Sequence, residues 1–226
     1  FSASENYHNH DVKVHFDEQM DTAYVQITNA FQGYNAIELL PLFIFLEDEK
    51  REEAVKQIIR ISDKEEKTEV FTYTNNSFTS ITERKPLTVS TTIHATNIVE
   101  KAGNKYLFKI GDLIGRQSEL YQEHERQFDM EIPNPHQYTR TIHVKIPEGY
   151  TVNNLQKLKM NIVSTYNGKE TCKFTSDYNL HGNELHVTIF EIYTSSFTPK
   201  SEYESYRKVI NAAADFNKIA LVFEKQ

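Results

Sequence analysis

The chain has one cysteine, and the chemistry that it could support is nucleophilic. Cys172 lies in the segment ETCKF, and His181 and His186 follow it along the chain. A cysteine nucleophile needs an imidazole within hydrogen-bond reach to take its proton. The alternation of residue types places Cys172 in the middle of a strand, on the side of Phe174, with one histidine in a turn and the other on a strand. We therefore predict a buried, unreactive thiol and no catalytic residue in this chain.

Histidines near the start of the chain are the best candidates for a metal site. His8 and His10 in HNHD would share a face if this segment is extended, and His15 follows them. No cysteine and no second histidine pair at zinc-like spacing completes a ligand set. We therefore expect these histidines to be solvated, and we predict neither a metal site nor a bound cofactor.

The other titratable groups fit ordinary surface positions. His94 and His143 fall on the polar faces of expected strands, and His124 and His136 fall in expected loops. An acidic run could bind a cation, and it comprises Glu47, Asp48, Glu49, Glu52 and Glu53. Because a helix start favours negative charge, we interpret this run as a solvated helix end.

Composition limits the classes of partner. The net charge of −7 and the pI of about 5.7 disfavour binding to a phosphate backbone, and no glycine-rich nucleotide motif is present. The longest apolar stretch, residues 39–46, is too short to span a bilayer, which needs about 20 residues. A single cysteine does not indicate a compartment. Because the chain starts at Phe1, we expect either a removed signal peptide or a piece of a longer protein.

The elements that must position these residues are mostly strands. Alternating residues predict a hairpin of strands 12–16 and 22–28, in which Val12 and Val14 face the core. Further strands are predicted at 69–74, 86–96, 105–110, 141–146, 157–166, 170–178 and 185–197. An Asn-Gly turn joins the strands 157–166 and 170–178 as a hairpin. Short strands at regular spacing, separated by turns, predict an antiparallel β-sandwich.

Two segments do not show the alternation of apolar and polar residues that is typical of strands. After Gly33 the chain becomes helical, with Val55, Ile58 and Ile59 on one face and Pro41 marking a kink or a boundary. A polar connection with one helical turn is predicted at 111–127, and a proline-rich turn at 132–138.

The chain ends in a predicted helix and strand. An apolar stripe at helical spacing comprises Tyr203, Tyr206, Ile210, Ala213 and Phe216. Ile219, Leu221 and Phe223 then alternate as in a strand. We expect the helix to bury its stripe on the sandwich and the last strand to join the sheet.

These elements predict an α+β fold that is mainly β. Residues 1–80 are expected to form a smaller lobe with a hairpin and helices. Residues 81–226 are expected to form the β-sandwich with its C-terminal helix and final strand. The division near residue 80 has no linker composition to support it.

Several segments of the chain resemble a known family. The segments RQFDMEIPNPHQYTRTIHVKIPEGYTV and LHVTIFEIYTSSFTPKSEYESYRKVINAAADFNKIALVFEK are similar to the C-terminal β-rich region, a domain of unknown function, of bacterial transglutaminase-like envelope proteins. The resemblance is best from about 116 to 226. Its motifs are structural, and they include IPEGY at 146–150 and the proline and tyrosine spacing of 199–206.

The resemblance implies a role and a location. The family's catalytic Cys, His and Asp would lie in a core upstream of Phe1, and this chain would support that core or dock a partner. The partners expected are that core and a protein or a glycan, without nucleic acid and without a membrane span. The implied location is the periplasm or cell envelope of a Gram-negative bacterium. The alternative from the residues alone is a glycan- or protein-binding module that uses a sheet face or edge.

Overall fold

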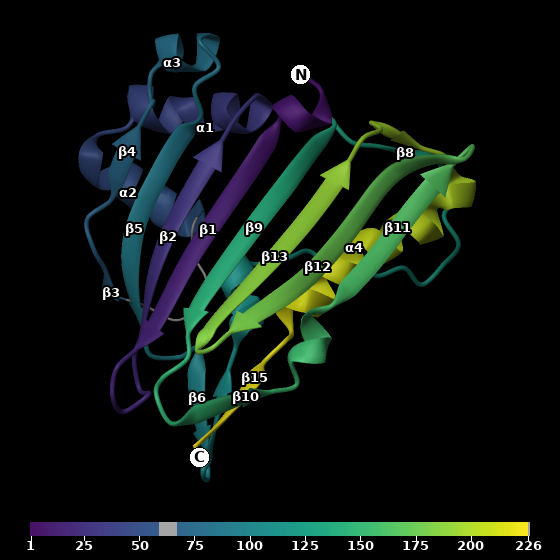
Figure 1. Cartoon of the computed structure of the whole chain (residues 1–226). Helices are drawn as coiled ribbons and strands as arrows, with labels where there is room; N and C mark the ends of the chain where they lie inside the picture. Colours follow the sequence, from purple (N-terminus) through teal and green to yellow (C-terminus); the bar gives the residue numbers. More distant parts are fainter. Residues whose placement is uncertain (59–66, 226) are drawn as a thin grey trace.

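A computed structural model, which describes residues 1–58 and 67–225, is built on one large twisted sheet (Figure 1). The strands run in the order β11, β12, β13, β9, β1, β2 and β5, and both β3 and β4 pair with β5. Their bounds are β1 (Tyr7–Phe16), β2 (Ala23–Phe31), β3 (Lys67–Thr68), β4 (Thr72–Thr74), β5 (Leu87–Ala95), β9 (His136–Lys145), β11 (Met160–Tyr166), β12 (Lys169–His181) and β13 (Glu184–Tyr193). The β1–β9 pair is parallel and the others are antiparallel, so the sheet is mixed.

Two smaller sheets complete the β structure. One has the order β10 (Tyr150–Asn153), β15 (Leu221–Lys225), β7 (Lys105–Phe108) and β6 (Val99–Ala102), and the other pairs β8 (Met130–Glu131) with β14 (Phe197–Thr198). The four-stranded sheet packs on one end of the large sheet through aromatic rings. The ring of Phe16 lies 5.1 Å from that of Phe108 and 5.5 Å from that of Phe223, edge to face in both cases.

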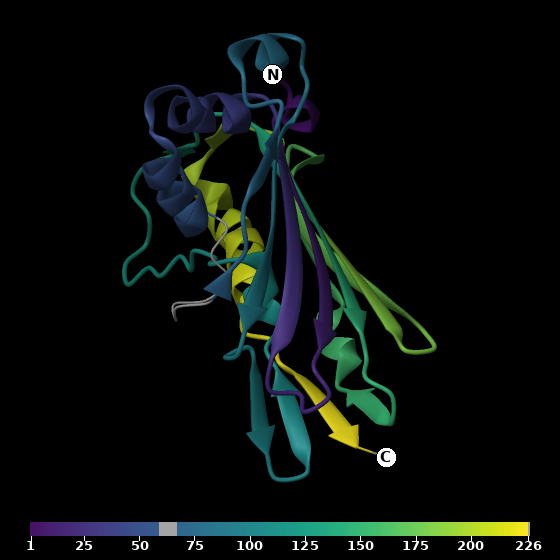
Figure 2. The same ribbon diagram turned by 90° about the vertical axis from the view of Figure 1, so that its left-hand side faces the viewer.

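The three longer helices lie on one side of the large sheet. The helices are α1 (Tyr34–Phe45), α2 (Asp48–Ile58), α3 (Phe78–Thr82) and α4 (Tyr203–Asn217), with 3₁₀ turns η1 (Ala3–Glu5), η2 (Ile110–Ile114), η3 (Leu155–Leu158) and η4 (Lys200–Glu202). Seen edge-on, the sheet has α1, α2 and α4 on the same side (Figure 2). Helix α4 contacts β11, β12 and η2, whereas α1 and α2 pack near β2 and β5.

Strand alternation therefore separates a covered face from an open face. In β5 every second residue is buried, beginning with Leu87, and the residues between them are only half-buried. In β1 the buried residues are His10, Val12 and Val14. The open face carries the intervening polar residues of seven strands, and no helix of the described chain lies over it (Figures 1 and 2).

Most of the predicted elements are confirmed, including the mainly β composition, the first hairpin and the Asn-Gly hairpin. Several boundaries differ from the predicted ones. In the segment 69–74 only Thr72–Thr74 is a strand (β4), α1 continues through Pro41, which is therefore not a helix boundary, and β9 begins at His136, inside the expected turn 132–138. Ile59 lies outside the described residues. Strands from 1–80 and from 81–226 pair in the same sheet, and the division near residue 80 stays a prediction.

The helix and strand at the end of the chain are confirmed. Tyr203, Tyr206, Ala213 and Phe216 are buried, and Ile210 is half-buried. The last strand, β15, joins the four-stranded sheet rather than the large one. Together α4 and β15 seal the covered face, because Phe216 and Phe223 belong to the same apolar core as the inward residues of the large sheet.

Candidate functional site

Cys172 lies on the covered face of the sheet and is fully buried. Burial raises the pKa of its thiol to about 12, and hydrogen bonds from Ser164 and Thr171 lower this pKa only in part. The thiol therefore stays protonated near neutral pH, and a protonated thiol is a poor nucleophile.

The two histidines that follow Cys172 lie far from it. Cys172 and His181 are near opposite ends of β12, so at about 3.3 Å per residue they are roughly 30 Å apart. His186 pairs with Asn179 near the same distant end. Neither imidazole can take a proton from the thiol.

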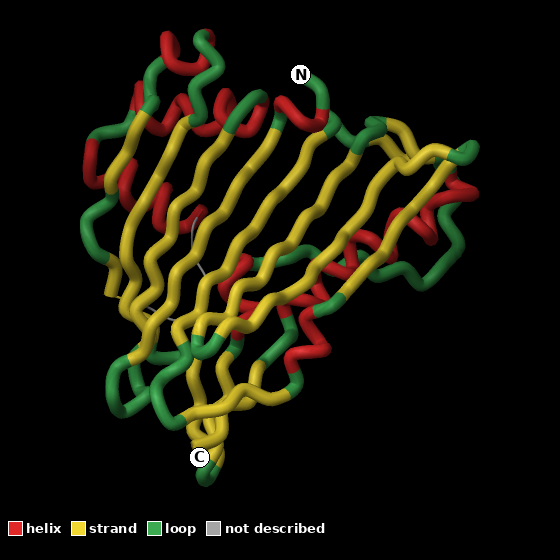
Figure 3. Tube along the Cα trace, in the orientation of Figure 1, coloured by secondary structure: helices red, strands yellow, loops and turns green. Residues whose placement is uncertain are grey.

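The open face carries a row of polar side chains that runs from β4 to β12, across strands that lie side by side in Figure 3. Pairing in successive strands aligns Thr72, Ser90, Thr28, Asp11, Thr141, Thr188 and Asp177. Some neighbours in the row are hydrogen-bonded. The Thr141 hydroxyl donates to Oδ2 of Asp11 at 2.6 Å, and the hydroxyls of Thr28 and Ser90 lie 3.0 Å apart. The row presents hydroxyl and carboxylate groups to solvent at strand spacing.

Histidines form the next row of the open face. His143 and His186 face each other across β9 and β13, with their Nδ1 atoms 2.9 Å apart, so one ring donates and the other accepts. Nε2 of His143 lies 3.4 Å from Oδ2 of Asp11. This cluster combines residues of β1, β9 and β13, which are far apart in the sequence, and only the pairing register brings them together.

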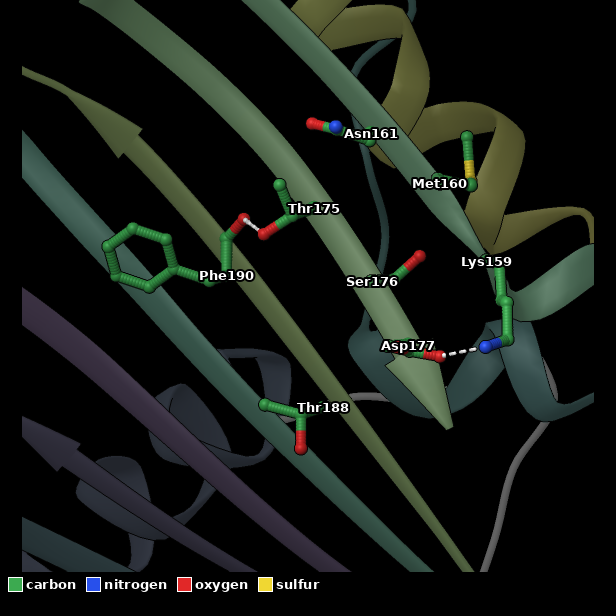
Figure 4. A pocket seen from close by; sticks show the side chains of 8 residues that line it. All are labelled: Lys159, Met160, Asn161, Thr175, Ser176, Asp177, Thr188 and Phe190. Carbon is green, nitrogen blue, oxygen red and sulfur yellow. Dashed lines mark hydrogen bonds and ion pairs between the residues drawn. The ribbon is translucent and has the colours of Figure 1, made fainter. Parts of the chain in front are cut away.

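A shallow hollow of about 510 Å³ lies on the open face near the β11 edge (Figure 4). Phe190 and Thr188 line it from β13, and Thr175 lines it from β12. An exposed ion pair between Lys159 and Asp177, at 2.9 Å, bounds the other side. One aromatic ring with several hydroxyl and charged groups around it can hold a polar, ring-shaped ligand by stacking and hydrogen bonds.

The other predicted surface positions agree only in part with the structure. The acidic run at the start of α2 is exposed, as expected. His94 hydrogen-bonds to Glu69 at 3.0 Å, His15 stacks on Tyr24 and His124 is exposed. The prediction that His136 lies in a loop is wrong, because it begins β9.

The prediction that His8 and His10 are solvated is also wrong. Both rings lie on the covered face, where His8 stacks on Phe31 with 4.3 Å between ring centroids and His10 is only 7% exposed. Burial lowers the pKa of His8 to about 3 and also lowers the pKa of His10, so both rings are neutral at physiological pH. They share a face, as extended chain requires, but the face is the inner one.

Neutral rings fix the proton positions around Asn29. Nε2 of His10 lies 2.8 Å from the carbonyl oxygen of Leu113, so Nε2 carries the proton and Nδ1 is an acceptor. One terminal atom of the Asn29 amide lies 2.7 Å from Nδ1 of His10 and 2.6 Å from Nε2 of His8. These contacts are satisfied when that atom is the amide nitrogen, which donates to both rings. The second terminal atom of the amide is buried without a partner among the described residues.

A buried ion pair lies beside the two histidines. Nη1 of Arg140 donates to Oε2 of Glu191 at 2.8 Å, and the hydroxyl of Tyr193 donates to the other carboxylate oxygen at 2.6 Å. The guanidinium also stacks over Tyr138, 4.9 Å from the ring centroid. Burial, with the nearby Glu191 charge, raises the pKa of Tyr193 and of Tyr138, so both phenols remain protonated donors.

Arg140 and Glu191 were not predicted as site residues, although the sequence contains a signal for them. Arg140 precedes the inward residue Ile142 by two positions, and Glu191 follows the inward residue Ile189 by two. Strand alternation therefore points both charged side chains into the core, where unpaired charges are rarely found. For Arg140 the signal was lost because the predicted strand began at residue 141, whereas Glu191 lay inside the predicted strand 185–197 and its inward position could have been read from the alternation.

Within residues 1–58 and 67–225, no group of three or more His, Cys, Asp or Glu side chains is arranged to hold a metal ion. No helix in this part of the chain combines the length and the apolar character needed to cross a membrane.

Comparison with known proteins places the chain in a family. A family model described as "Domain of Unknown Function with solved-structure structure (DUF3858)" matches residues 104–223, more than half of the chain. No curated protein and no solved structure gives a match. The matched range runs from the start of β7 into β15 and includes the buried Arg140 and Glu191. The chain belongs to the DUF3858 family, a domain of unknown function.

Proposed function

We propose that this chain is a non-catalytic accessory module of a bacterial transglutaminase-like protein of the cell envelope. In this proposal, its open sheet face docks the transglutaminase-like core of the same polypeptide. The resemblance of 116–226 to the region that follows such cores supports the family link, and the family match over 104–223 is compatible with it. The periplasm or envelope location follows from the same resemblance.

The row of polar side chains across the open face carries the proposal. A sheet with one face sealed by helices and the other lined by hydroxyls, carboxylates and imidazoles presents a broad hydrogen-bonding surface. Protein interfaces of standard size bury about 800 Å² on each partner and use about ten hydrogen bonds. A surface of this kind suits a folded polar partner better than a membrane or an apolar peptide.

The state of Cys172 supports a non-catalytic role. Its thiol lies on the sealed face, far from His181 and His186, and its raised pKa keeps it protonated. The nucleophile of the whole protein would then lie in the upstream core.

The proposal is tested by binding in trans. The longer reading frame is sequenced, the segment upstream of Phe1 is expressed separately, and its affinity for this chain is measured by calorimetry. Thr188→Arg places a large cation in the centre of the open face and should weaken binding at least tenfold. Asn104→Arg, at an exposed turn between β6 and β7, is the matched control and should not change binding. Equal affinity of the two variants, or no transglutaminase-like core upstream, would contradict the proposal.

A second candidate function, glycan binding, is favoured by the hollow at Phe190. Phe190 lines this hollow together with Thr175, Thr188 and the Lys159–Asp177 pair, a combination of groups that suits a sugar ring. Titration with soluble oligosaccharides tests this function. Phe190→Ala is the test variant, and Val163→Ala, at an exposed position on β11, is the control. Binding that is lost only in Phe190→Ala supports this function, and binding that is unchanged in Phe190→Ala opposes it.

A further inference from the structure

The inward positions of three neighbouring strands change from apolar to polar at the same end of the sheet. This change occurs where β1, β9 and β13 approach the N-terminal half of α4. The apolar inward residues are Val12, Val14, Ile142, Val144, Leu185, Val187 and Ile189, and the polar ones are His8, His10, His136, Tyr138, Arg140, Glu191 and Tyr193. Alternation continues through the change, so one patch of the covered face is built from titratable side chains.

This polar patch is costly to keep in a core. A buried ion pair is often no more stabilising than apolar side chains of similar volume, because both charges lose their hydration. Arg140 and Glu191 are 6% and 5% exposed, so both charges have lost most of their hydration. Stability alone gives no physical reason for charges at two inward positions whose neighbours Ile142 and Ile189 are apolar.

A cavity of about 370 Å³ lies against the polar patch. The strands β1, β9 and β13 form its floor, while α4, the end of η2 with the segment after it, and Ile58 at the end of α2 form its other walls. On the α4 side the lining is apolar and includes Ile210 and Ala213, with Ile114 from the end of η2. The volume is at the lower end of the roughly 300–1,000 Å³ typical of small-molecule sites.

Some hydrogen-bonding groups that line the cavity have no partner in the described part of the chain. Among the described residues, Arg140 makes one hydrogen bond, from Nη1 to Glu191, and it lines the cavity, so its Nε and Nη2 donors are available to a ligand there. Nδ1 of His136 lies 2.8 Å from the carbonyl oxygen of Asn134 and therefore carries the proton, which leaves Nε2 as an acceptor in the neutral ring. The cavity thus offers guanidinium donors at one point and an apolar wall opposite.

We propose that this cavity binds a small monocarboxylate with an apolar tail. The carboxylate would accept from the free edge of the Arg140 guanidinium, whose planar donors match two carboxylate oxygens. The tail would pack on Ile210 and Ala213. A second guanidinium, that of Arg116, also lines the cavity, whereas the carboxylate of Glu191 disfavours a doubly charged ligand such as phosphate.

The test compares two probes of the same shape. Calorimetric titration of the whole chain uses 3-phenylpropanoate and its neutral isostere 3-phenylpropanamide. The proposal expects the acid to bind at least tenfold more tightly than the amide, because only the acid uses the charge of Arg140. Equal affinities, or no binding of either probe at 20 mM, would overturn it.

Three variants test whether the probes bind in this cavity. Arg140→Met/Glu191→Leu removes both charges together, a replacement that buried ion pairs tolerate, and should reduce the preference for the acid to less than twofold. Lys159→Met/Asp177→Leu removes an exposed ion pair on the other face and should leave the preference unchanged. Ile210→Trp, which fills the cavity and keeps the ion pair, should weaken both probes at least tenfold. A tenfold preference that persists in Arg140→Met/Glu191→Leu, or unchanged binding in Ile210→Trp, contradicts the site. This inference is independent of the docking role of the open face.

Discussion

The guanidinium of Arg140 and the carboxylate of Glu191 form a hydrogen-bonded ion pair across β9 and β13, with 2.8 Å between Nη1 and Oε2. Both side chains are more than nine-tenths buried, and the hydroxyl of Tyr193 completes the coordination of the carboxylate. The pair lies on the covered face of a sheet whose other face is open. The covered face thus contains a buried ion pair and the open face contains exposed polar groups, and the two faces are tested by different experiments.

Removing one partner of the buried pair should be far more harmful than removing both. Glu191→Gln leaves the charge of Arg140 buried without its counter-ion, and we expect the free energy of unfolding to fall by about 3–5 kcal/mol. Arg140→Met/Glu191→Leu should be within about 1 kcal/mol of the wild type or more stable. Asp177→Asn, at the exposed pair with Lys159, should cost less than about 1 kcal/mol. Urea unfolding measures all three, and a Glu191→Gln variant as stable as Asp177→Asn would contradict the assignment.

The elements with strictly local signals were predictable from the sequence. The hairpin of β1 and β2 follows from alternation in VKVHF and in the segment after it, and the hairpin of β11 and β12 follows from Asn167 and Gly168, which both adopt positive φ. The helix α4 follows from its aromatic stripe. Each of these signals lies within a few residues of the element that it predicts.

Alternation marks single inward polar residues such as Arg140 and Glu191, but the grouping of residues into candidate sites was not predictable, because they meet through distant pairing. His10 is buried through its contacts with Asn29 and with Leu113, and the latter lies 103 residues away. The parallel pairing of β1 with β9 places Asp11 beside Thr141, and nothing local to either segment specifies this register. From the sequence alone, a polar residue at an inward position is assigned to the surface unless its partners are known.

The buried histidines predict that stability depends on pH. The folded pKa values of His8 and His10 lie below the unfolded value of about 6.5, so the unfolded state binds more protons as the pH falls. Their contribution is present above pH 6.5 and is lost progressively below it, for His8 down to about pH 3. Below pH 6, the free energy of unfolding should fall with decreasing pH less steeply in His8→Gln than in the wild type. The two slopes should differ by about 1.4 kcal/mol per pH unit.

The matched control for this slope is His181→Gln, which changes an exposed histidine at the end of β12. Urea unfolding between pH 7 and pH 4.5 should give the wild-type slope in His181→Gln. Identical slopes in the wild type and in His8→Gln would show that the His8 ring is not held neutral.

Cys172 should resist alkylation in the folded protein. Its buried thiol, with a pKa raised to about 12, is protonated at pH 8 and inaccessible. Reaction with a thiol reagent should therefore require opening of the core, and we expect it to be at least about 1,000-fold slower than in urea. Cys172→Ser/Leu180→Cys, with the new thiol at an exposed position on the same strand, is the control and should react fast. A rapidly reacting wild-type thiol would restore the possibility of a catalytic cysteine.

Gly111 should be intolerant of any side chain. A Cβ at this position would collide with the carbonyl group of Asn217, where η2 meets the end of α4. The same junction is closed by a hydrogen bond from the Gly111 amide to the carbonyl oxygen of Ile219, at 3.0 Å. We expect Gly111→Ala to lose more than about 2 kcal/mol of unfolding free energy, as overpacked positions do.

Gly103→Ala is the comparison for this junction. Its Cβ would meet open space, and only its positive φ would cost about 1–2 kcal/mol. Thermal and urea unfolding of both variants measure the difference. If Gly111→Ala proves no less stable than Gly103→Ala, the tight contact between η2 and α4 is not required for the fold.

The central claim is that the open face of the sheet is a docking surface for a transglutaminase-like core. Hydroxyl-radical footprinting tests it most directly, because the radicals oxidise exposed His and Phe side chains. When the separately expressed core is added, oxidation of His143, His186 and Phe190 should fall at least fivefold, while that of the exposed loop residues Tyr121 and Phe128 stays constant. Unchanged oxidation of the open-face residues in the presence of saturating core would contradict the account.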